Sequence, residues 1–162
     1  MDRLHIDAAK LRQNMFQSAL AAVFVMASFW LTMHVDQQLL VASLGASAFI
    51  ATFPRAHFAK ARNLVGGYAC GAFWGVLLSL VKGYGLVDSS MGFVAVCCGL
   101  AVFLTALSML MLNMEHPPAA ALTLSITLSQ EPIQLAAIAL ACVVGLWLCR
   151  VALFSATGDT DT

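Results

Sequence analysis

The chain has 162 residues, of which 61% are hydrophobic and 10% are charged, and its formal net charge is zero. Soluble domains carry about 25% charged residues, so this composition leaves too little polar surface to cover a water-soluble core and predicts an integral membrane protein. The balanced charge, with no basic block interleaved with aromatic residues, argues against nucleic acid as a partner.

The chain starts with a charged N-terminal segment, residues 1–16, in which apolar residues recur at helical spacing: Leu4, Ala8, Leu11 and Met15. This pattern fits a short helix at the membrane surface, and a solvated lead-in fits it equally. The segment lacks the apolar core and small-residue cleavage site of a secretory signal, so we expect it to be retained. Residues 155–162 are polar and are expected to form a frayed tail.

Six apolar segments lie in the transmembrane region, residues 17–154. Four of them are long enough, at roughly 20 residues, to cross about 30 Å of hydrocarbon as helices; they are 17–33, 63–81, 91–112 and 133–154. The other two, 39–53 and 117–129, are expected to be short, broken or re-entrant helices. The predicted fold class is an all-α polytopic membrane protein with four long and two short helices.

The segment order is long, short, long and again long, short, long, with turn residues at 82–90 between the halves. This order predicts a 3+3 inverted repeat with halves at about 17–81 and 91–154, a plan common among secondary transporters. If all six segments cross and the N-terminus is cytoplasmic, seven Lys and Arg residues lie inside and only Lys82 lies outside. If both short segments turn back, the count becomes five against three. We therefore expect a multi-pass protein of the bacterial inner membrane with a cytoplasmic N-terminus.

The third segment carries glycine at every fourth position, at Gly67, Gly71 and Gly75. Such a ridge lets helix backbones approach closely, which matters because lipid offers no hydrophobic drive for helix association. We interpret the ridge as a helix-packing surface. Its partner could lie in the same chain or in a second subunit, so a homo-oligomer stays open.

Residues 113–121 place an ionisable pair, Glu115 and His116, directly before a helix opened by two prolines. The start of that helix would present free backbone N–H groups and the positive end of its dipole, which favours an anion. An ionised Glu115 would oppose an anion, so it should point away, pair with a base or be protonated. The plainer interpretation is that the pair caps the connection at the membrane interface. The candidate binding residues here are His116, Pro117, Pro118, Ala119, Ala120 and Thr123.

A second half-helix is expected to start at Gly45, with the hydroxyl of Ser47 near its beginning. The basic loop that follows reads mainly as an orientation signal and a lipid-headgroup contact. Arg62 and Asn63 are its functional candidates, because they lie at the edge of the glycine-rich helix. If the two half-helix starts face each other, they predict a binding site for a small monovalent anion.

No other group of residues in the sequence forms a pattern typical of a metal site or a catalytic site. All five cysteines fall in apolar segments without the paired spacing of a zinc or iron–sulfur site, and we interpret them as packing residues. No nucleophile, base and orienting group stand in an arrangement typical of an enzyme. We therefore expect no metal, no cofactor and no enzymatic activity.

Together these stretches resemble the HPP family of integral membrane proteins, over roughly residues 15 to 155. The family's His-Pro-Pro motif and the small residues after it are matched by His116 to Ala121, its Gly-Ala-Ser run by Gly45 to Ser47, and its Arg-Asn and Gly-Gly pairs by Arg62, Asn63, Gly66 and Gly67. The glycine that many members carry after the prolines is missing. The family is described with about four transmembrane helices, and its plant chloroplast members are associated with nitrite transport. The resemblance thus implies a small inorganic anion as substrate.

Two functions follow as hypotheses. The favoured one is a transporter or channel for a small inorganic anion, with nitrite as the expected substrate and His116 supplying positive charge or a proton. The alternative is a membrane module that anchors or senses without transport and assembles through the glycine ridge. The alternative predicts tolerance of Ser47→Ala and His116→Ala, and loss of function on Gly71→Leu. The expected partners are the anion, membrane lipid and a second copy of the chain.

Overall fold

The computed structural model describes residues 15–16, 18–19, 22–27, 30, 38–52, 57–83 and 90–157. Every element in these ranges is a helix: α2 (Gln38–Ala51), the 3-10 turn η1 (His57–Ala59), α3 (Ala61–Gly83), α4 (Met91–Leu112), α5 (Pro118–Leu128) and α6 (Pro132–Thr157). Most of the N-terminal segment 1–16 and of the first long segment 17–33 lies outside the described residues. Helix α6 continues three residues into the expected tail 155–162.

Among the described residues, three helices are long and apolar enough to cross a membrane, at Ala61–Gly83, Met91–Leu112 and Pro132–Ala152. They correspond to three of the four long segments expected from the sequence. Helices α2 and α5 are apolar but have only 14 and 11 residues. At 1.5 Å per residue, the shorter reaches about 17 Å of the roughly 30 Å of hydrocarbon. The prediction of an all-helical, multi-pass membrane protein with short helices between longer ones is confirmed.

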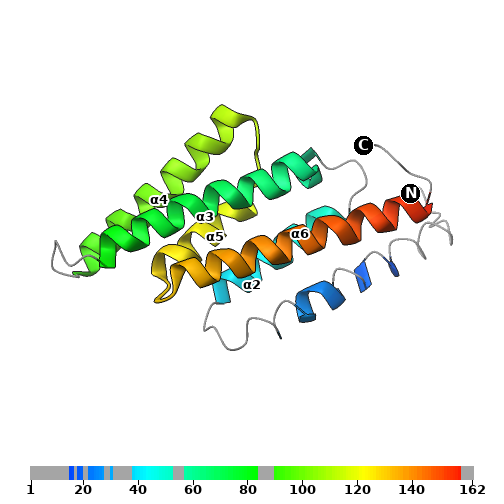
Figure 1. The fold of residues 1–162 in the computed structure, drawn as a ribbon, viewed down its shortest axis with the longest axis horizontal. Coiled ribbons are helices and arrows are strands. Elements are labelled where there is room, and N and C mark those ends of the chain that lie inside the picture. The colour runs from blue at the N-terminus through cyan, green and yellow to red at the C-terminus, as the bar shows by residue number, and fades with distance from the viewer. Residues whose placement is uncertain are drawn as a thin grey trace, which may run out of the picture.

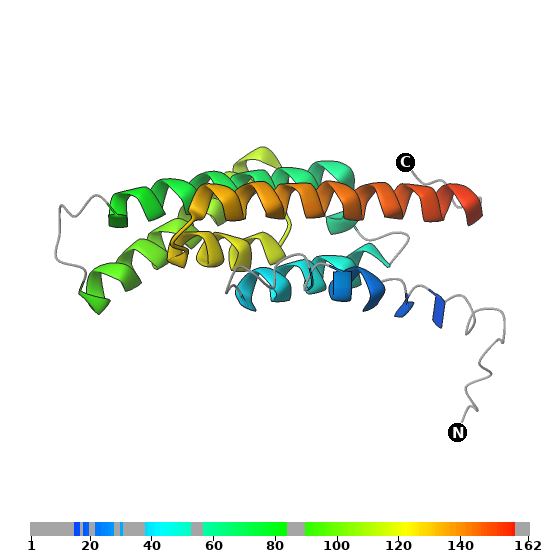
Figure 2. The same ribbon diagram turned by 60° about the horizontal axis from the view of Figure 1, so that its bottom comes forward.

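Helix α3 is the centre of the bundle. It contacts α4, α5 and α6, and 44% of its apolar window is buried against 22% for α4. In Figure 1, α3 and α6 lie side by side and run in opposite directions. In Figure 2, α5 and α2 lie together beneath this pair. The two short helices are therefore packed against long ones and against each other.

The side chains divide into an apolar core and an apolar outer surface. The core is formed by fully buried residues of α2, α3, α5 and α6, namely Leu40, Leu44, Leu64, Leu122, Ile126, Leu135 and Val143. The outer surface also carries large apolar side chains, such as Phe73, Val96, Phe103 and Leu148. Outward-facing apolar side chains on long helices fit contact with lipid, where the helices satisfy their own backbone hydrogen bonds.

The glycine ridge of α3 packs against α5 and against His116, which lies two residues before that helix. A Cβ added at Gly67 would lie 2.6 Å from Cβ of His116, and one at Gly75 would lie 2.8 Å from Cβ of Ile126. A Cβ at Gly71 would lie 2.8 Å from the backbone oxygen of Ala119. The helix partner of the ridge thus lies in the same chain, and the close approach needs hydrogen in place of a side chain.

Helix α4 ends in a tight cap that turns the chain back toward α3. Asn113 is left-handed, with φ 57° and ψ 43°, and its N–H donates to the carbonyl of Leu110. The N–H of Met114 donates to the carbonyl of Met109 at 2.9 Å, which completes a Schellman motif. Nη2 of Arg62 donates to a third terminal carbonyl, that of Leu112, at 2.7 Å. This cap delivers the next residues, including His116, to the bundle.

Changing Asn113 should test the cap. Valine at this position is expected to destabilise the protein by about 1–2 kcal/mol, because a β-branched side chain is strained in the left-handed region. Asn113→Gly should keep or raise stability, since glycine adopts this conformation without strain. Thermal unfolding of both variants in detergent checks this, and equal midpoints for the valine and glycine variants would contradict the cap geometry.

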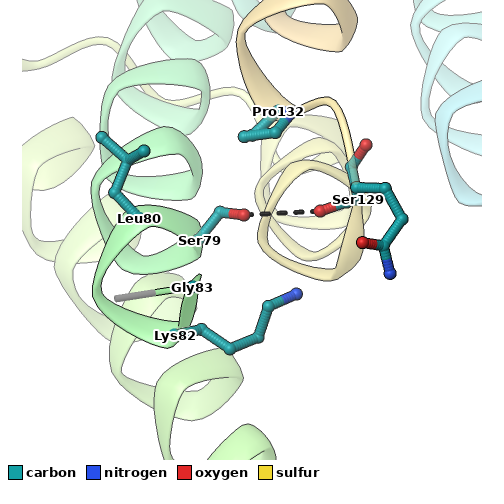
Figure 3. A pocket seen from close by; sticks show the side chains of 7 residues that line it. Ser79, Leu80, Lys82, Gly83, Ser129 and Pro132 are labelled. Carbon is teal, nitrogen blue, oxygen red and sulfur yellow. Dashed lines mark hydrogen bonds between the residues drawn. The ribbon is translucent and has the colours of Figure 1, made fainter. Parts of the chain in front are cut away.

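The C-terminal end of α5 is held by polar side chains of α3. Nζ of Lys82 donates to the carbonyl of Thr127 at 2.7 Å, and Oγ of Ser79 lies 3.5 Å from the carbonyl oxygen of Ser129. Figure 3 shows both side chains reaching toward the end of α5. They line an open pocket of about 310 Å³. A helix leaves its last carbonyls without helical partners, and a cation is favoured there by the helix dipole. Lys82 therefore serves as a cap for this short helix.

Candidate functional site

His116 lies at the break between α4 and α5 and is fully buried. Its Nδ1 is 2.9 Å from the carbonyl oxygen of Phe58 in η1, and its Nε2 is 2.8 Å from Oγ of Ser47 in α2. The ring of Tyr68 in α3 faces the imidazole at a centroid distance of 5.6 Å. One side chain thus joins η1, α2 and α3 at the start of α5.

Two serines of α2 extend these contacts. Oγ of Ser43 and Oγ of Ser47, one helical turn apart, each lie 2.9 Å from the hydroxyl of Tyr68. Ser43 donates to the carbonyl of Pro118 at 2.7 Å, and Oγ of Ser47 is 3.0 Å from the carbonyl oxygen of Ser43. All four polar side chains are fully buried. We refer to Ser43, Ser47, Tyr68 and His116 as the His116 network.

The contacts determine the tautomer of His116. A carbonyl oxygen can only accept, so Nδ1 carries the hydrogen that is donated to Phe58. His116 lies outside the three helices that are long enough to cross a membrane. Burial lowers its pKa to about 4, although the hydrogen bond to the Phe58 carbonyl acts in the opposite direction. The imidazole is therefore neutral at neutral pH, and its Nε2 accepts a hydrogen bond from Ser47.

This protonation state can be measured by ¹⁵N NMR of histidine-labelled protein, with His116→Gln used to assign the signal. We expect a protonated Nδ1 and an unprotonated Nε2 that persist from pH 7.5 to pH 5.5. An unfolded histidine takes up a proton below pH 6.5, whereas folded His116 does so only near pH 4. Its contribution should therefore lower folding stability as pH falls from about 6.5 to 4. A protonated Nε2 in the purified protein at pH 6 would contradict this state.

Ser47 does reach His116, but from a different position in its helix than the sequence suggested. Helix α2 begins at Gln38, so Ser47 lies in its third turn and Gly45 is an interior residue. The prediction of a half-helix starting at Gly45 is wrong. A Cβ at Gly45 would lie 3.6 Å from Cγ2 of Val25, an ordinary contact distance. Gly45 therefore does not mark a helix start.

The start of α5 offers no free backbone donors to an anion. An α-helix begins with four N–H groups that lack helical partners. Here Pro117 and Pro118 have no N–H. The N–H of Ala119 donates to the backbone carbonyl of His116 at 2.9 Å, and that of Ala120 donates to the backbone carbonyl of Pro117 at 3.1 Å. The prediction that this helix start supplies N–H donors is wrong, because the prolines remove two donors and short-range bonds use the other two. Any polar site here must be built from side chains.

Arg62 and Asn63 hold the ends of other elements. Arg62 caps α4 through the carbonyl of Leu112. Nδ2 of Asn63, which is buried, donates to the carbonyl of His57 at 3.0 Å and lies 3.1 Å from its Nδ1. These contacts connect α3 to α4 and to η1, and none of them reaches the His116 network. A direct role for the pair in substrate binding stays a prediction.

Thr123 joins α5 to α4. Its Oγ1 donates to the carbonyl of Ala119 at 2.9 Å and lies 3.0 Å from Oγ1 of Thr105. It also lies against the ridge, 2.9 Å from where a Cβ of Gly71 would be. The structure thus places Thr123 at a packing contact between α3, α4 and α5, five residues after Pro118, whose carbonyl Ser43 contacts.

Sequence reasoning missed two members of the network, Ser43 and Tyr68. Ser43 precedes Ser47 by four residues, so the two share a helix face. Tyr68 stands inside the glycine ridge, where a phenol hydroxyl in an apolar helix requires a polar partner. Both signals can be read from the sequence around each residue, but neither identifies the hydrogen-bond partner. Glu115 is half-buried and takes no part in the bonds of the network.

Comparison with known proteins gives one match. A family model described as HPP, transmembrane region, matches residues 6–158 of the chain. The matched region contains every described helix and all members of the His116 network. No curated protein and no solved structure matches the chain.

Proposed function

Because the chain belongs to the HPP family of transmembrane proteins, we propose that it is a transporter or channel for a small inorganic anion, with nitrite as the first candidate. Nitrite is chosen because plant chloroplast members of the family are associated with nitrite transport. The proposed setting is the bacterial inner membrane, with the N-terminus in the cytoplasm. The seven-to-one distribution of Lys and Arg in a six-crossing arrangement supports this orientation.

The observation that carries the proposal is the fully buried His116 network. Polar groups inside a membrane protein are costly, and ionisable ones there commonly mark substrate paths. The network offers three hydroxyl donors and an imidazole, and it contains no carboxylate. This is the donor-rich, non-acidic composition that suits a small anion. In the present arrangement the donors bind one another, so α2 must separate from His116 and α5 before an anion replaces these bonds.

We further propose that this movement occurs between the halves of a 3+3 inverted repeat. Corresponding helices would be α2 with α5 and α3 with α6, and each pair is in contact. The long pair runs in opposite directions, as inverted halves require (Figure 1). Val25 lies next to Gly45 of α2, and Thr105 of α4 lies next to Thr123 of α5, so the first segment of each half contacts the second. In such folds one half rocks against the other around a central site.

Uptake of nitrite into proteoliposomes tests the proposed function. We expect saturable uptake in the native chain and a loss of about tenfold or more in Ser47→Ala and His116→Gln, a factor that corresponds to about 1.4 kcal/mol. Ser79→Ala is the matched control, because Ser79 is also a buried serine but lies outside the network. Its uptake should stay near that of the native chain. No uptake of nitrite, nitrate, chloride or formate above that of protein-free liposomes would contradict the proposal.

The alternative of an anchoring or sensing module receives less support. It requires the glycine ridge of α3 to be available to a second protein. In this structure the ridge packs against α5 and His116 of the same chain. An assembly partner would therefore have to use another surface.

A further inference from the structure

The hydroxyl groups of the His116 network can accommodate a neutral histidine. Ser43 donates to Pro118, and Nδ1 of His116 donates to Phe58. Ser47 then donates to Nε2 at 2.8 Å, and Tyr68 donates to Oγ of Ser47 at 2.9 Å. Each of these four donors has an acceptor, and Nε2 is satisfied.

The same heavy atoms also accommodate a protonated histidine. If Nε2 gains a hydrogen, it donates to Oγ of Ser47 across the same 2.8 Å. The Ser47 hydroxyl then turns to the carbonyl oxygen of Ser43 at 3.0 Å, and the Tyr68 hydroxyl turns to Oγ of Ser43 at 2.9 Å. Every hydrogen again has an acceptor. Proton uptake therefore requires rotation of two hydroxyl groups and no movement of the helices.

None of the described groups that contact the ring neutralises the resulting charge. Helix α2 presents Ser43 and Ser47, α3 presents the phenol of Tyr68, and η1 presents the Phe58 carbonyl. Among the described residues, Glu115 is the neighbouring carboxyl group in the chain, and it is outside the network. A buried charge without a partner is costly. An anion bound beside Ser47 would supply that partner, and by linkage the bound anion and the proton would each strengthen binding of the other.

From this arrangement we propose that Nε2 of His116 binds a proton together with the transported anion, so that the protein is a proton–anion symporter. The inference rests on the proposed function. The lone pair of Nε2 takes a proton from water on the side where the anion enters, and the N–H bond breaks again when the proton is released on the other side. One proton and one monovalent anion cross together, so no net charge moves.

The driving force for accumulation tests the symport. Proteoliposomes receive either an acid-outside gradient of one pH unit at zero potential, or an inside-positive potential of about 60 mV at equal pH. We expect the pH gradient to accumulate nitrite up to about tenfold and the potential to have no effect. Protein-free liposomes measure permeation of nitrous acid and are subtracted. Accumulation driven by the potential and not by the pH gradient would overturn the symport while the anion transporter stands. Absence of uptake under both conditions would overturn the proposed function and the symport together.

His116→Gln and NMR supply an independent test. Glutamine keeps hydrogen-bonding groups but cannot take up a proton, so accumulation driven by the pH gradient should be lost, while His57→Gln, outside the network, should keep it. In the native protein at pH 6, ¹⁵N NMR should show hydrogen on Nε2 of His116 only when nitrite is present. Gradient-driven accumulation in His116→Gln equal to that of the native chain, or an Nε2 unchanged by saturating nitrite, would overturn the proposal.

Discussion

Replacing Gly71 with leucine is expected to prevent α3 and α5 from packing. Even a Cβ at this position would lie 2.8 Å from the backbone oxygen of Ala119 and 2.9 Å from Oγ1 of Thr123. Backbone cannot rotate away as a flexible side chain can, so the helices themselves must separate. Overpacking a well-packed interior costs about 1–3 kcal/mol, and leucine adds three further carbons, so we expect a loss above about 3 kcal/mol.

Gly99→Leu is the matched control for this prediction. Gly99 lies in the middle of α4, and an added Cβ would meet nothing within 4 Å. Its replacement removes a residue of low helix propensity, which should leave stability unchanged or raise it by up to about 1 kcal/mol. Thermal unfolding and monodispersity in detergent compare the two variants. A Gly71→Leu protein as stable as Gly99→Leu would mean that the ridge does not pack on α5.

Replacing His116 with alanine is expected to destabilise the protein by about 3–5 kcal/mol. The change removes a fully buried ring, leaves the Phe58 carbonyl without the Nδ1 donor, and takes from Ser47 one of its three partners. A buried polar group that loses its partner costs about 1–3 kcal/mol, and the cavity adds to that cost. His57→Ala is the control, because His57 is exposed, and it should cost less than about 1 kcal/mol.

The measurement is unfolding of the His116→Ala and His57→Ala proteins under the same conditions. Similar midpoints would show that His116 does not join η1, α2 and α3. The expected result also affects the transport experiment, because lost uptake in His116→Ala combines a folding defect with a lost donor. His116→Gln, normalised to folded protein, separates these two effects. Transport and anchoring both require the folded protein. An anchoring module is therefore no longer expected to tolerate His116→Ala, and His116→Gln is the variant that tests it.

Several local features were predictable because they depend on residues close together in the chain. The apolar segment 91–112 coincides with α4, since turn residues precede it and a polar stretch follows it. Segments 39–53 and 117–129 were too short to cross as ordinary helices, and α2 and α5 are short helices. The prediction at Gly45 was wrong because a glycine followed by a serine is typical of a helix start. Here the apolar residues before Gly45 already belong to the same helix.

Composition and segment length in the sequence determined that the chain is helical and belongs in a membrane. The reason is that a helix of about 20 apolar residues matches the thickness of the hydrocarbon layer. The sequence also indicated His116 and Ser47 as a pair of interest. Only the tertiary structure decided their geometry. It joined Ser43 to Tyr68 across 25 residues, Ser47 to His116 across 69 and Ser43 to Pro118 across 75. It also gave the glycine ridge its partner and used the backbone donors of α5 internally, because hydrogen-bond partners between helices are set by packing rather than by position along the chain.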